Sequence, residues 1–451
     1  MATKVTSMKF EIYQNSTWTE YTIYDNKFKI TQQIDLFEGK IKDTIVDLSI
    51  KYSNSLYNYL IQNKNVNARI YVNNTIIFTG YIEIKFKVIR NTKLPDKIDL
   101  SIVGFFNKLR KKYKTIKKYT SKTPAYIIND LLSIANLTLY SSPSELSNIT
   151  LTKTFDLSIT TPAEIIEKLL YECGYTGYEK TINNQNYIVI NTIKQNLPTA
   201  YTYQENIIES SNYQIINEVI LTKELNDVDE VSIKYYDLEN FSNQILFEDT
   251  TNQNSIYRCY IPIAPGDYYQ NNDAGVYLDL QYSKNNQSFE IFDISSASLD
   301  IQKDSDIQVI ESYLTENNRY FVKIKNNSSN STRYIYKLQI KGSGSIKKNI
   351  NFQKIDVSDG DKKVEYECKY IQNTTKAQNL CDSLAHLYKY SNYKVTFDCF
   401  THSGLFSKCQ LDSVKGLGTI NCITTRIVID YELNKNIIYN TENYLIGDVI
   451  T

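Results

Sequence analysis

Short runs of alternating apolar and polar residues constrain this chain more than any other feature, and residues 67 to 113 contain the clearest examples. Two of these runs, 70 to 78 and 80 to 90, are rich in Ile, Val, Tyr and Phe, which favour a half-buried pleated surface. Asn73-Asn74 and Gly80 supply turn chemistry around them. The pattern predicts a β-meander, and nothing in it names an activity.

The neighbouring segments extend this β pattern. The run from 97 to 105 alternates before a break at Gly104 and predicts a third strand that leaves the edge of a barrel. Short runs between residues 8 and 50 alternate in the same way, with turns expected at Asp25-Asn26 and Gly39. A short helix is expected over 53 to 64, where Ser53 is a suitable N-cap and four residues fall at helical spacing: Leu56, Tyr57, Leu60 and Ile61. Residues 1 to 113 therefore predict one all-β barrel with a single helix.

Length and charge limit the class of protein. A chain of 451 residues has room for two to four domains. Its 50 basic and 50 acidic residues give no net charge, which argues against whole-molecule steering toward nucleic acid or an anionic membrane. No window reaches the roughly 18 apolar residues of a membrane span, and the first residues do not resemble a signal peptide. Seven scattered cysteines are typical of reduced thiols made in a cytosol.

One segment departs from this charge balance. Residues 107 to 122 carry eight basic residues and no acidic one: Lys108, Arg110, Lys111, Lys112, Lys114, Lys117, Lys118 and Lys122. Such a run contacts phosphates in some proteins, because each neutralised phosphate releases a counterion. It is also typical of a solvated linker or of a patch that faces an acidic neighbour. The segment has no recognition helix or stacking motif, which favours the second interpretation.

Two helices of matching design are expected next. Residues 123 to 132 and 161 to 170 share the pattern T-P-A-x-I-I-x-x-L-L, with Thr as N-cap and Pro in the first turn. Each places its Ile and Leu residues on one apolar face that must pack on a sheet. The second helix is expected to end at Gly174, and a hairpin with an Asn-rich turn follows up to Ile193. Residues 114 to 200 therefore predict a small α/β domain.

This order of elements resembles the baseplate hub proteins of long-tailed bacteriophages and of related contractile injection machines. The resemblance rests on a β-rich segment that ends in I-x-L-S-I-V-G-F-F-N-K-L, on the two T-P-A helices, and on Cys173-Gly174-Tyr175. Residues 213 to 222 look like the strand that opens the second barrel of that family, and 373 to 390 look like its late helix. Strands at 393 to 400, 407 to 414 and 419 to 432 would close that barrel.

The resemblance implies a mainly β fold with α+β insertions: two tail-tube-like β-barrels, a small α/β domain and an inserted β-sandwich. The first barrel would span residues 1–113 and the α/β domain 114–200. The second barrel, with the late helix, would combine 201–238 and 346–435, around a sandwich at 239–345 and before a C-terminal tail at 436–451. Polar turns and Gly342-Ser343-Gly344-Ser345 mark the exit of the sandwich.

The resemblance also implies a function. The chain would be a non-enzymatic virion protein, a homotrimer at the baseplate or tail tip, assembled in the host cytoplasm. It would join the tail tube above to a spike, fibre or tape-measure protein below, with DNA present only in transit. Seven basic residues are then candidate inter-subunit or lumen contacts: Lys108, Arg110, Lys111, Lys112, Lys114, Lys117 and Lys118.

Two alternatives stay open. A carbohydrate-binding adhesin would use exposed tyrosines of residues 239–345, although the 39 tyrosines of the chain are in part what an AT-rich genome encodes. A cell-wall hydrolase is the second alternative, but the two histidines, His386 and His402, lie in no catalytic motif, and no nucleotide-binding loop occurs. No catalytic residue, cofactor or metal is therefore expected. Four residues are of the right types for zinc but lack its usual spacing: Cys399, His402, Cys409 and Cys422.

Overall fold

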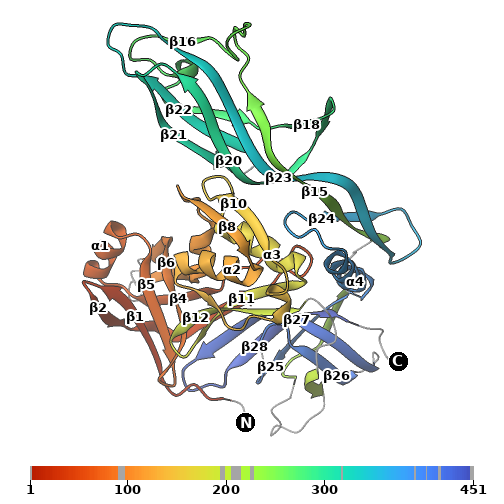
Figure 1. The fold of residues 1–451 in the computed structure, drawn as a ribbon. Helices are drawn as coiled ribbons and strands as arrows, with labels where there is room; N and C mark the ends of the chain where they lie inside the picture. Colours follow the sequence, from red (N-terminus) through yellow and green to blue (C-terminus); the bar gives the residue numbers. More distant parts are fainter. Residues whose placement is uncertain are drawn as a thin grey trace.

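The computed structural model describes residues 3–89, 97–192, 199–204, 215–223, 228–315, 318–390, 393–402, 404–414 and 418–446. Its fold is mainly β, as predicted, and it divides into a large sheet, a small α/β unit above it, and a long arm (Figure 1). Residues 90–96 of the predicted meander and residues 213–214 of the predicted opening strand lie outside the described residues.

The large sheet contains 13 strands drawn from both ends of the chain. Seven come from the N-terminal part: β1 (Met8–Gln14), β2 (Thr17–Tyr21), β3 (Ile23–Gln33), β4 (Ile45–Lys51), β5 (Val66–Val72), β6 (Thr75–Ile89) and β7 (Lys97–Val103). Six come from later segments: β13 (Thr199–Gln204), β14 (Ile220–Lys223), β25 (Tyr393–Cys399), β26 (Lys408–Val414), β27 (Gly418–Glu432) and β28 (Ile438–Leu445). Helix α1 (Asn54–Gln62) interrupts the first set, as predicted.

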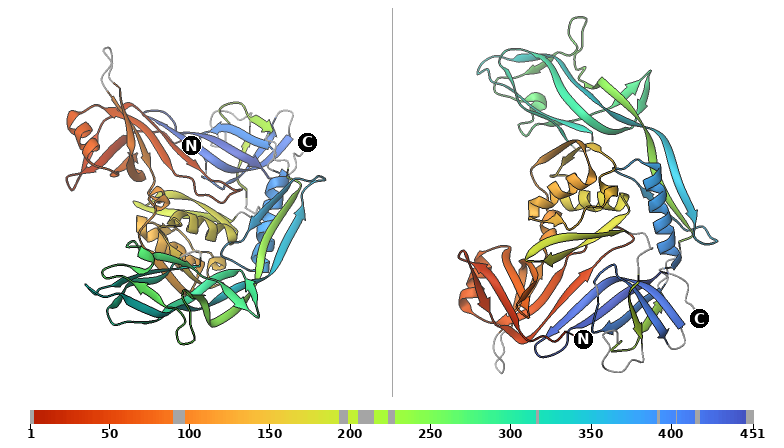
Figure 2. Two further views of the ribbon diagram at one scale, coloured as in Figure 1. Left: turned by 90° about the horizontal axis from the view of Figure 1, so that it is seen from above. Right: turned by 60° about the horizontal axis from the view of Figure 1, so that its bottom comes forward.

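The two sets of strands are joined along one seam, where β27 pairs antiparallel with β3. At this seam Phe28 stacks on Tyr431, its partner in the ladder, with ring centroids 4.8 Å apart. Lys29 forms an ion pair with Asp430 at 3.0 Å. Strands of the two predicted barrels therefore belong to one sheet, and they curl on either side of the seam (Figure 2).

Residues 105–192 form the α/β unit. It contains η1 (Phe105–Arg110), β8 (Ile116–Lys122), α2 (Pro124–Leu132), η2 (Ser133–Ala135), β9 (Thr138–Leu139), η3 (Ser144–Leu146), β10 (Leu151–Asp156), α3 (Pro162–Glu172), β11 (Tyr175–Ile182) and β12 (Gln185–Thr192). Both T-P-A helices form as predicted: Thr123 and Thr161 accept the N-cap hydrogen bonds, and Thr161 completes a capping box with Glu164. The apolar faces of α2 and α3 share one core.

The arm is built on two long paired strands, β15 (Glu230–Glu248) and β23 (Arg333–Asp356). Near the large sheet these strands pack against α4 (Thr374–Tyr390), the predicted late helix, and β15 also pairs with β24 (Lys363–Glu367). Further out, two sheets share one apolar core, as expected of a sandwich. Their other elements are β16 (Ile261–Ile263), η4 (Tyr269–Asn271), β17 (Val276–Asp279), β18 (Tyr282–Lys284), β19 (Gln287–Phe289), β20 (Ile291–Lys303), β21 (Ile307–Thr315) and β22 (Arg319–Asn326).

Three predicted turns or linkers are instead parts of strands. Gly80 lies inside β6, where a Cβ would come within 2.3 Å of the Val103 carbonyl oxygen, so glycine permits close strand approach. Asp25 and Asn26 have positive φ inside β3, where the pairing with β4 shifts register. The predicted exit linker lies inside β23, and a Cβ on Gly344 would meet the Asp293 carbonyl oxygen at 2.1 Å.

Other predictions are also corrected. β7 lies between β4 and β6, so it does not leave at an edge. Ile61, placed on the apolar face of the first helix, has 56% of its surface exposed, while Leu56 and Leu60 are buried. The segment 436–451, expected to be a tail, contains β28, which pairs with both β25 and β27. Sequence alternation missed β28 because its inward-facing residues include polar Thr441 and Asn443.

Candidate interaction surfaces

The basic segment predicted as a contact site is split between two roles. Lys111, Lys112, Lys114 and Lys118 are exposed. By contrast, the other three predicted residues have partners inside the chain. Lys108 lies over the Phe105 ring at 4.3 Å, and its burial lowers its pKa. Lys117 forms an ion pair with Asp130 at 3.0 Å, so acids from other elements offset part of the run.

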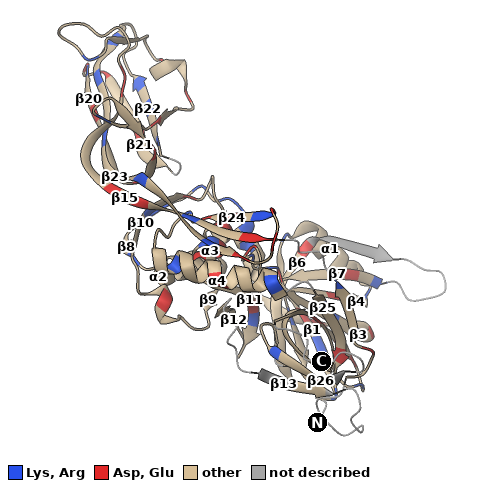
Figure 3. Cartoon of the chain, turned by 90° about the vertical axis from the view of Figure 1, so that its right-hand side faces the viewer, with Lys and Arg blue, Asp and Glu red and all other residues tan. Residues whose placement is uncertain are grey.

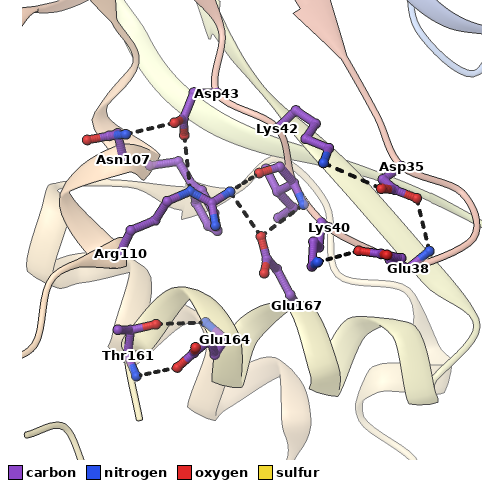
Figure 4. A network of polar contacts seen from close by, with 12 residues as sticks. Asp35, Glu38, Lys40, Lys42, Asp43, Asn107, Arg110, Thr161, Glu164 and Glu167 are labelled. Carbon is purple, nitrogen blue, oxygen red and sulfur yellow. Dashed lines mark hydrogen bonds and ion pairs between the residues drawn. The ribbon is translucent and has the colours of Figure 1, made fainter. Parts of the chain in front are cut away.

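Arg110 is the centre of a polar junction between the large sheet and the α/β unit (Figure 4). Its guanidinium lies 3.5 Å from the Asp43 carboxylate and 3.2 Å from that of Glu167 on α3, and it donates to the Ile41 carbonyl oxygen. Glu167 also accepts a hydrogen bond of 3.0 Å from the Ile41 backbone N–H. Arg110 therefore ties the loop before β4 to α3, which is a structural role.

Two further buried glutamates of the α/β unit fasten backbone segments. Glu172, at the end of α3, accepts hydrogen bonds of 2.6, 2.9 and 2.7 Å from the N–H groups of residues 369, 370 and 371, just before α4. Glu179, on β11, accepts bonds of 2.8 and 2.9 Å from the N–H groups of Phe105 and Phe106, at the start of η1. Glu172 thus bonds the α/β unit to the segment before α4, and Glu179 fastens η1 to β11 within the unit.

These carboxyl groups have an unusual electrostatic environment. Burial raises the pKa of Glu172 and of Glu179 to about 7 each, although the backbone donors act in the opposite direction. Burial also raises the pKa of Glu167, and Arg110 opposes this effect. Sequence reasoning missed all three residues. The available signal for Glu172 was its position three residues after Leu169, on the apolar face of α3.

An ion pair is among the contacts between the arm and the α/β unit, in which β10 lies against β20 and β21. Lys153 on β10 lies 3.0 Å from the Asp293 carboxylate on β20, and the two side chains are only 11% and 17% exposed. The Lys153 ammonium also lies 4.2 Å from the centre of the Phe292 ring. Burial raises the pKa of Asp293, and Lys153 opposes this shift. The pair is therefore a largely desolvated contact that holds the arm beside β10.

A groove of about 940 Å³ runs over the seam of the large sheet. Strands β3, β4, β7 and β27 supply its lining, which includes the stacked rings of Phe28 and Tyr431. Both signs of charge line it: Lys27, Lys29, Lys97 and Lys435 on one hand, and Asp25, Asp47, Asp99, Asp430 and Glu432 on the other. Figure 3 shows the same mixing of signs along the rest of the chain.

The four residues weighed for zinc lie in the part of the sheet around β26, and His402 forms hydrogen bonds there. The Gly404 N–H donates to His402 Nδ1 at 3.0 Å, and His402 Nε2 lies 3.0 Å from Thr424 Oγ1. Thr424 in turn donates to Asn443 Oδ1 at 2.7 Å. Burial lowers the pKa of His402 to about 4 and raises the pKa values of the thiols of Cys399, Cys409 and Cys422.

Among the described residues, no group of three or more His, Cys, Asp and Glu side chains is arranged to hold a metal ion. The second histidine, His386, is partly buried on α4 and its ring centre lies 4.5 Å from that of Tyr390. It is therefore a partly buried residue of α4 that packs against an aromatic neighbour. No helix within the described ranges has both the length and the apolar character that crossing a membrane requires.

No protein-family model and no curated protein sequence matches the chain. Solved structures do. The tail protein from Neisseria meningitidis MC58 has a TM-score of 0.52 at 7% identity, with 97% of this chain and 95% of that one covered. The 43 kDa tail protein of prophage MuSo2 from Shewanella oneidensis has 0.48 at 7% identity, covering 97% and 98%. Prophage tail protein gp18 from Listeria monocytogenes EGD-e has 0.43 at 8% identity, covering 96% and 94%.

The similarity to the Neisseria meningitidis protein, at 7% identity, is a similarity of fold. It extends over nearly the whole of both chains, so it includes the large sheet, the α/β unit and the arm together. The chain therefore has the fold of a tail protein, and the resemblance to phage tail proteins that was predicted from the sequence is confirmed at the level of fold.

Proposed function

We propose that this protein is a structural component of a phage tail, a trimeric hub at the baseplate or tail tip. In this role it joins the tail tube to a spike or fibre and surrounds a channel for DNA. The observation that carries the proposal is the fold similarity to a tail protein over 97% of the chain. The protein would be located in the tail of the virion.

The shape of the large sheet supports this assignment. Along the main path of the described strands, β2 and β14 are the ends, one from each half of the sheet, and β13 ends a branch through β26. A strand at an end of a sheet leaves backbone N–H and C=O groups for a partner. Three copies arranged head to tail would place β2 of one chain beside the C-terminal half of the next, and the contact closes if the rotation is threefold. Six similar half-sheets would then surround one lumen.

The seam groove supports passage of DNA without retention. Lysines and carboxylates alternate along it, and several are already paired, including Lys29 with Asp430 and Lys97 with Asp99. A lumen that must release DNA cannot neutralise many phosphates, because each one adds salt-sensitive affinity. In the assembled ring the groove would face the lumen. The exposed lysines of the basic segment, Lys111, Lys112, Lys114 and Lys118, would lie at a contact with a neighbouring subunit or tail protein.

Sedimentation analysis of the purified full chain tests the proposal. At micromolar concentration in mild salt we expect a single species of three times the 52.4 kDa chain mass. Glu20→Lys changes an exposed residue of the end strand β2, and should shift the equilibrium toward monomer. Glu311→Lys, an exposed change on the arm, is the matched control and should leave the trimer intact. A monomer of the unchanged chain under these conditions would contradict the proposal.

A further inference from the structure

Four tyrosines pack together on β23 and on the segment before β16. Strand β16 lies at the outer end of the arm (Figure 1). Tyr334 and Tyr336 lie on β23 on either side of the fully buried Ile335, so their side chains point away from the arm's core. Tyr257 packs on Tyr336 with ring centroids 4.6 Å apart, and Tyr260 packs on Tyr334 at 4.5 Å. The cluster thus has an inner pair on the sheet and an outer pair above it.

The rings of each pair are nearly parallel. Tyr257 and Tyr260 are inclined by 26° with centroids 5.9 Å apart, and Tyr334 and Tyr336 by 23° with centroids 6.5 Å apart. The centroids within each pair are thus farther apart than those of Tyr257 and Tyr336, at 4.6 Å, or of Tyr260 and Tyr334, at 4.5 Å. Tyr257 and Tyr260 therefore lie side by side and form one aromatic platform, supported from beneath by the other two rings.

Hydrogen bonds hold the platform in place. Asp304 accepts from the Tyr336 hydroxyl at 2.8 Å and from the Tyr334 backbone N–H at 2.9 Å, which fixes the inner pair. The Asn254 side chain accepts from the Tyr257 N–H at 2.8 Å, and the Tyr260 N–H donates to the Thr251 carbonyl oxygen at 2.8 Å. The buried Cys259 anchors the same segment between the two outer tyrosines. The platform is therefore preorganised, which lowers the entropic cost of binding.

Polar groups adjoin this segment and add hydrogen-bonding capacity. Arg258, which follows Tyr257 in the sequence and has a side chain 62% exposed, lies 3.9 Å from the Glu248 carboxylate. An aromatic platform beside a guanidinium and a carboxylate matches the two kinds of surface on a pyranose, whose C–H face stacks on a ring and whose hydroxyls donate and accept. The charges at the rim oppose each other, which favours a neutral sugar over a charged one. A protein partner would instead need a far larger apolar area around the rings.

We propose that Tyr257 and Tyr260, together with Arg258 and Glu248, form a binding site for a neutral pyranose oligosaccharide at the end of the arm. The ligand stacks on the two outer rings and bonds the polar pair through its hydroxyls. This inference rests on the proposed tail function only for its biological setting, a cell-surface glycan, since the site itself lies within one chain. It identifies the arm as the part of the molecule that touches a surface.

Isothermal titration of the full chain with cellohexaose, chitohexaose and maltohexaose tests the site. At least one of the three should bind saturably, and Tyr257→Ala or Tyr260→Ala should weaken it about tenfold, the value of one aromatic contact. Tyr257→Phe keeps the ring and should retain most of the affinity. Tyr277→Ala removes an exposed tyrosine elsewhere on the arm, 49% exposed, and should bind as the unchanged chain does.

Three results would overturn the site. The first is that none of the three sugars binds saturably, and the second is that Tyr277→Ala weakens sugar binding as much as Tyr257→Ala does. The third is that Tyr257→Ala leaves sugar binding unchanged and abolishes binding to another protein. The last result would assign the platform to a protein interface. Sedimentation of the same variants separates this question from the tail proposal. A trimer that binds no sugar refutes the site alone, and a monomer that binds sugar refutes the trimeric hub alone.

Discussion

Removal of the Lys153 ammonium should release the arm from the α/β unit. In the Lys153→Met variant the Asp293 carboxylate, 17% exposed, loses the cation that lies 3.0 Å away. Breaking one partner of a buried pair costs about 3 to 5 kcal/mol, because the remaining charge stays desolvated. The observed exposures allow some solvent screening, so we expect about 3 kcal/mol, a change of more than a hundredfold in the ratio of docked to released arms.

Small-angle scattering measures this release as a larger radius of gyration, and hydrogen exchange measures it as faster exchange in β10 and β20. Lys337→Met is the matched control, because it removes a partly exposed ion pair with Asp300 within the arm. It should change neither the radius of gyration nor the exchange rates. The double variant Lys153→Met/Asp293→Leu replaces both charges by apolar groups and should restore docking. Unchanged scattering and exchange in Lys153→Met would refute the reasoning.

Three further predictions concern the interior of the molecule. Glu172→Ala removes the acceptor of three backbone N–H groups, of which those of Tyr370 and Ile371 are buried, and should destabilise the chain by about 3 kcal/mol, with faster hydrogen exchange at Tyr370. Arg110→Ala should lower the free energy of unfolding, measured in urea, by about 2 kcal/mol, because Glu167 loses its cation. Arg110→Lys should restore only part of this loss. His402 has a pKa of about 4 in the fold and 6.5 when unfolded, so the unfolded state binds its proton first and stability should fall by about 3 kcal/mol as pH drops from 6.5 to 4. His402→Gln should flatten that part of the pH profile, and a profile as steep as that of the unchanged chain would show that another group is responsible.

Local patterns of the sequence were sufficient for many elements. The T-P-A helices were predictable because Thr and Pro at their N-termini act through bonds within one turn. The late helix and the strands β25, β26 and β27 were expected from the resemblance to the hub family, and they form at similar bounds. By contrast, the seam between β3 and β27 joins residues such as Lys29 and Asp430, which are 401 positions apart. No local pattern encodes such a pairing, and the resemblance, which implied two barrels, gave no pairing between them.

The candidate contacts show the same limit. The basic run was visible in the sequence, but the acids that offset it, Asp43, Asp130 and Glu167, belong to other elements. Tyrosines are so frequent that the four at the end of the arm could not be singled out until the structure placed Tyr257 and Tyr260 over β23. Sequence patterns did not indicate the buried glutamates, because their partners are backbone N–H groups, which carry no sequence signature.

Electron microscopy of the purified full chain tests the central claim most directly. We expect particles with threefold symmetry, in which six curled half-sheets surround an open lumen and three arms project from the ring. The seam groove should line that lumen. Single chains, or open filaments in place of closed rings, would contradict the account, because the end strands β2 and β14 would then not meet around a threefold axis.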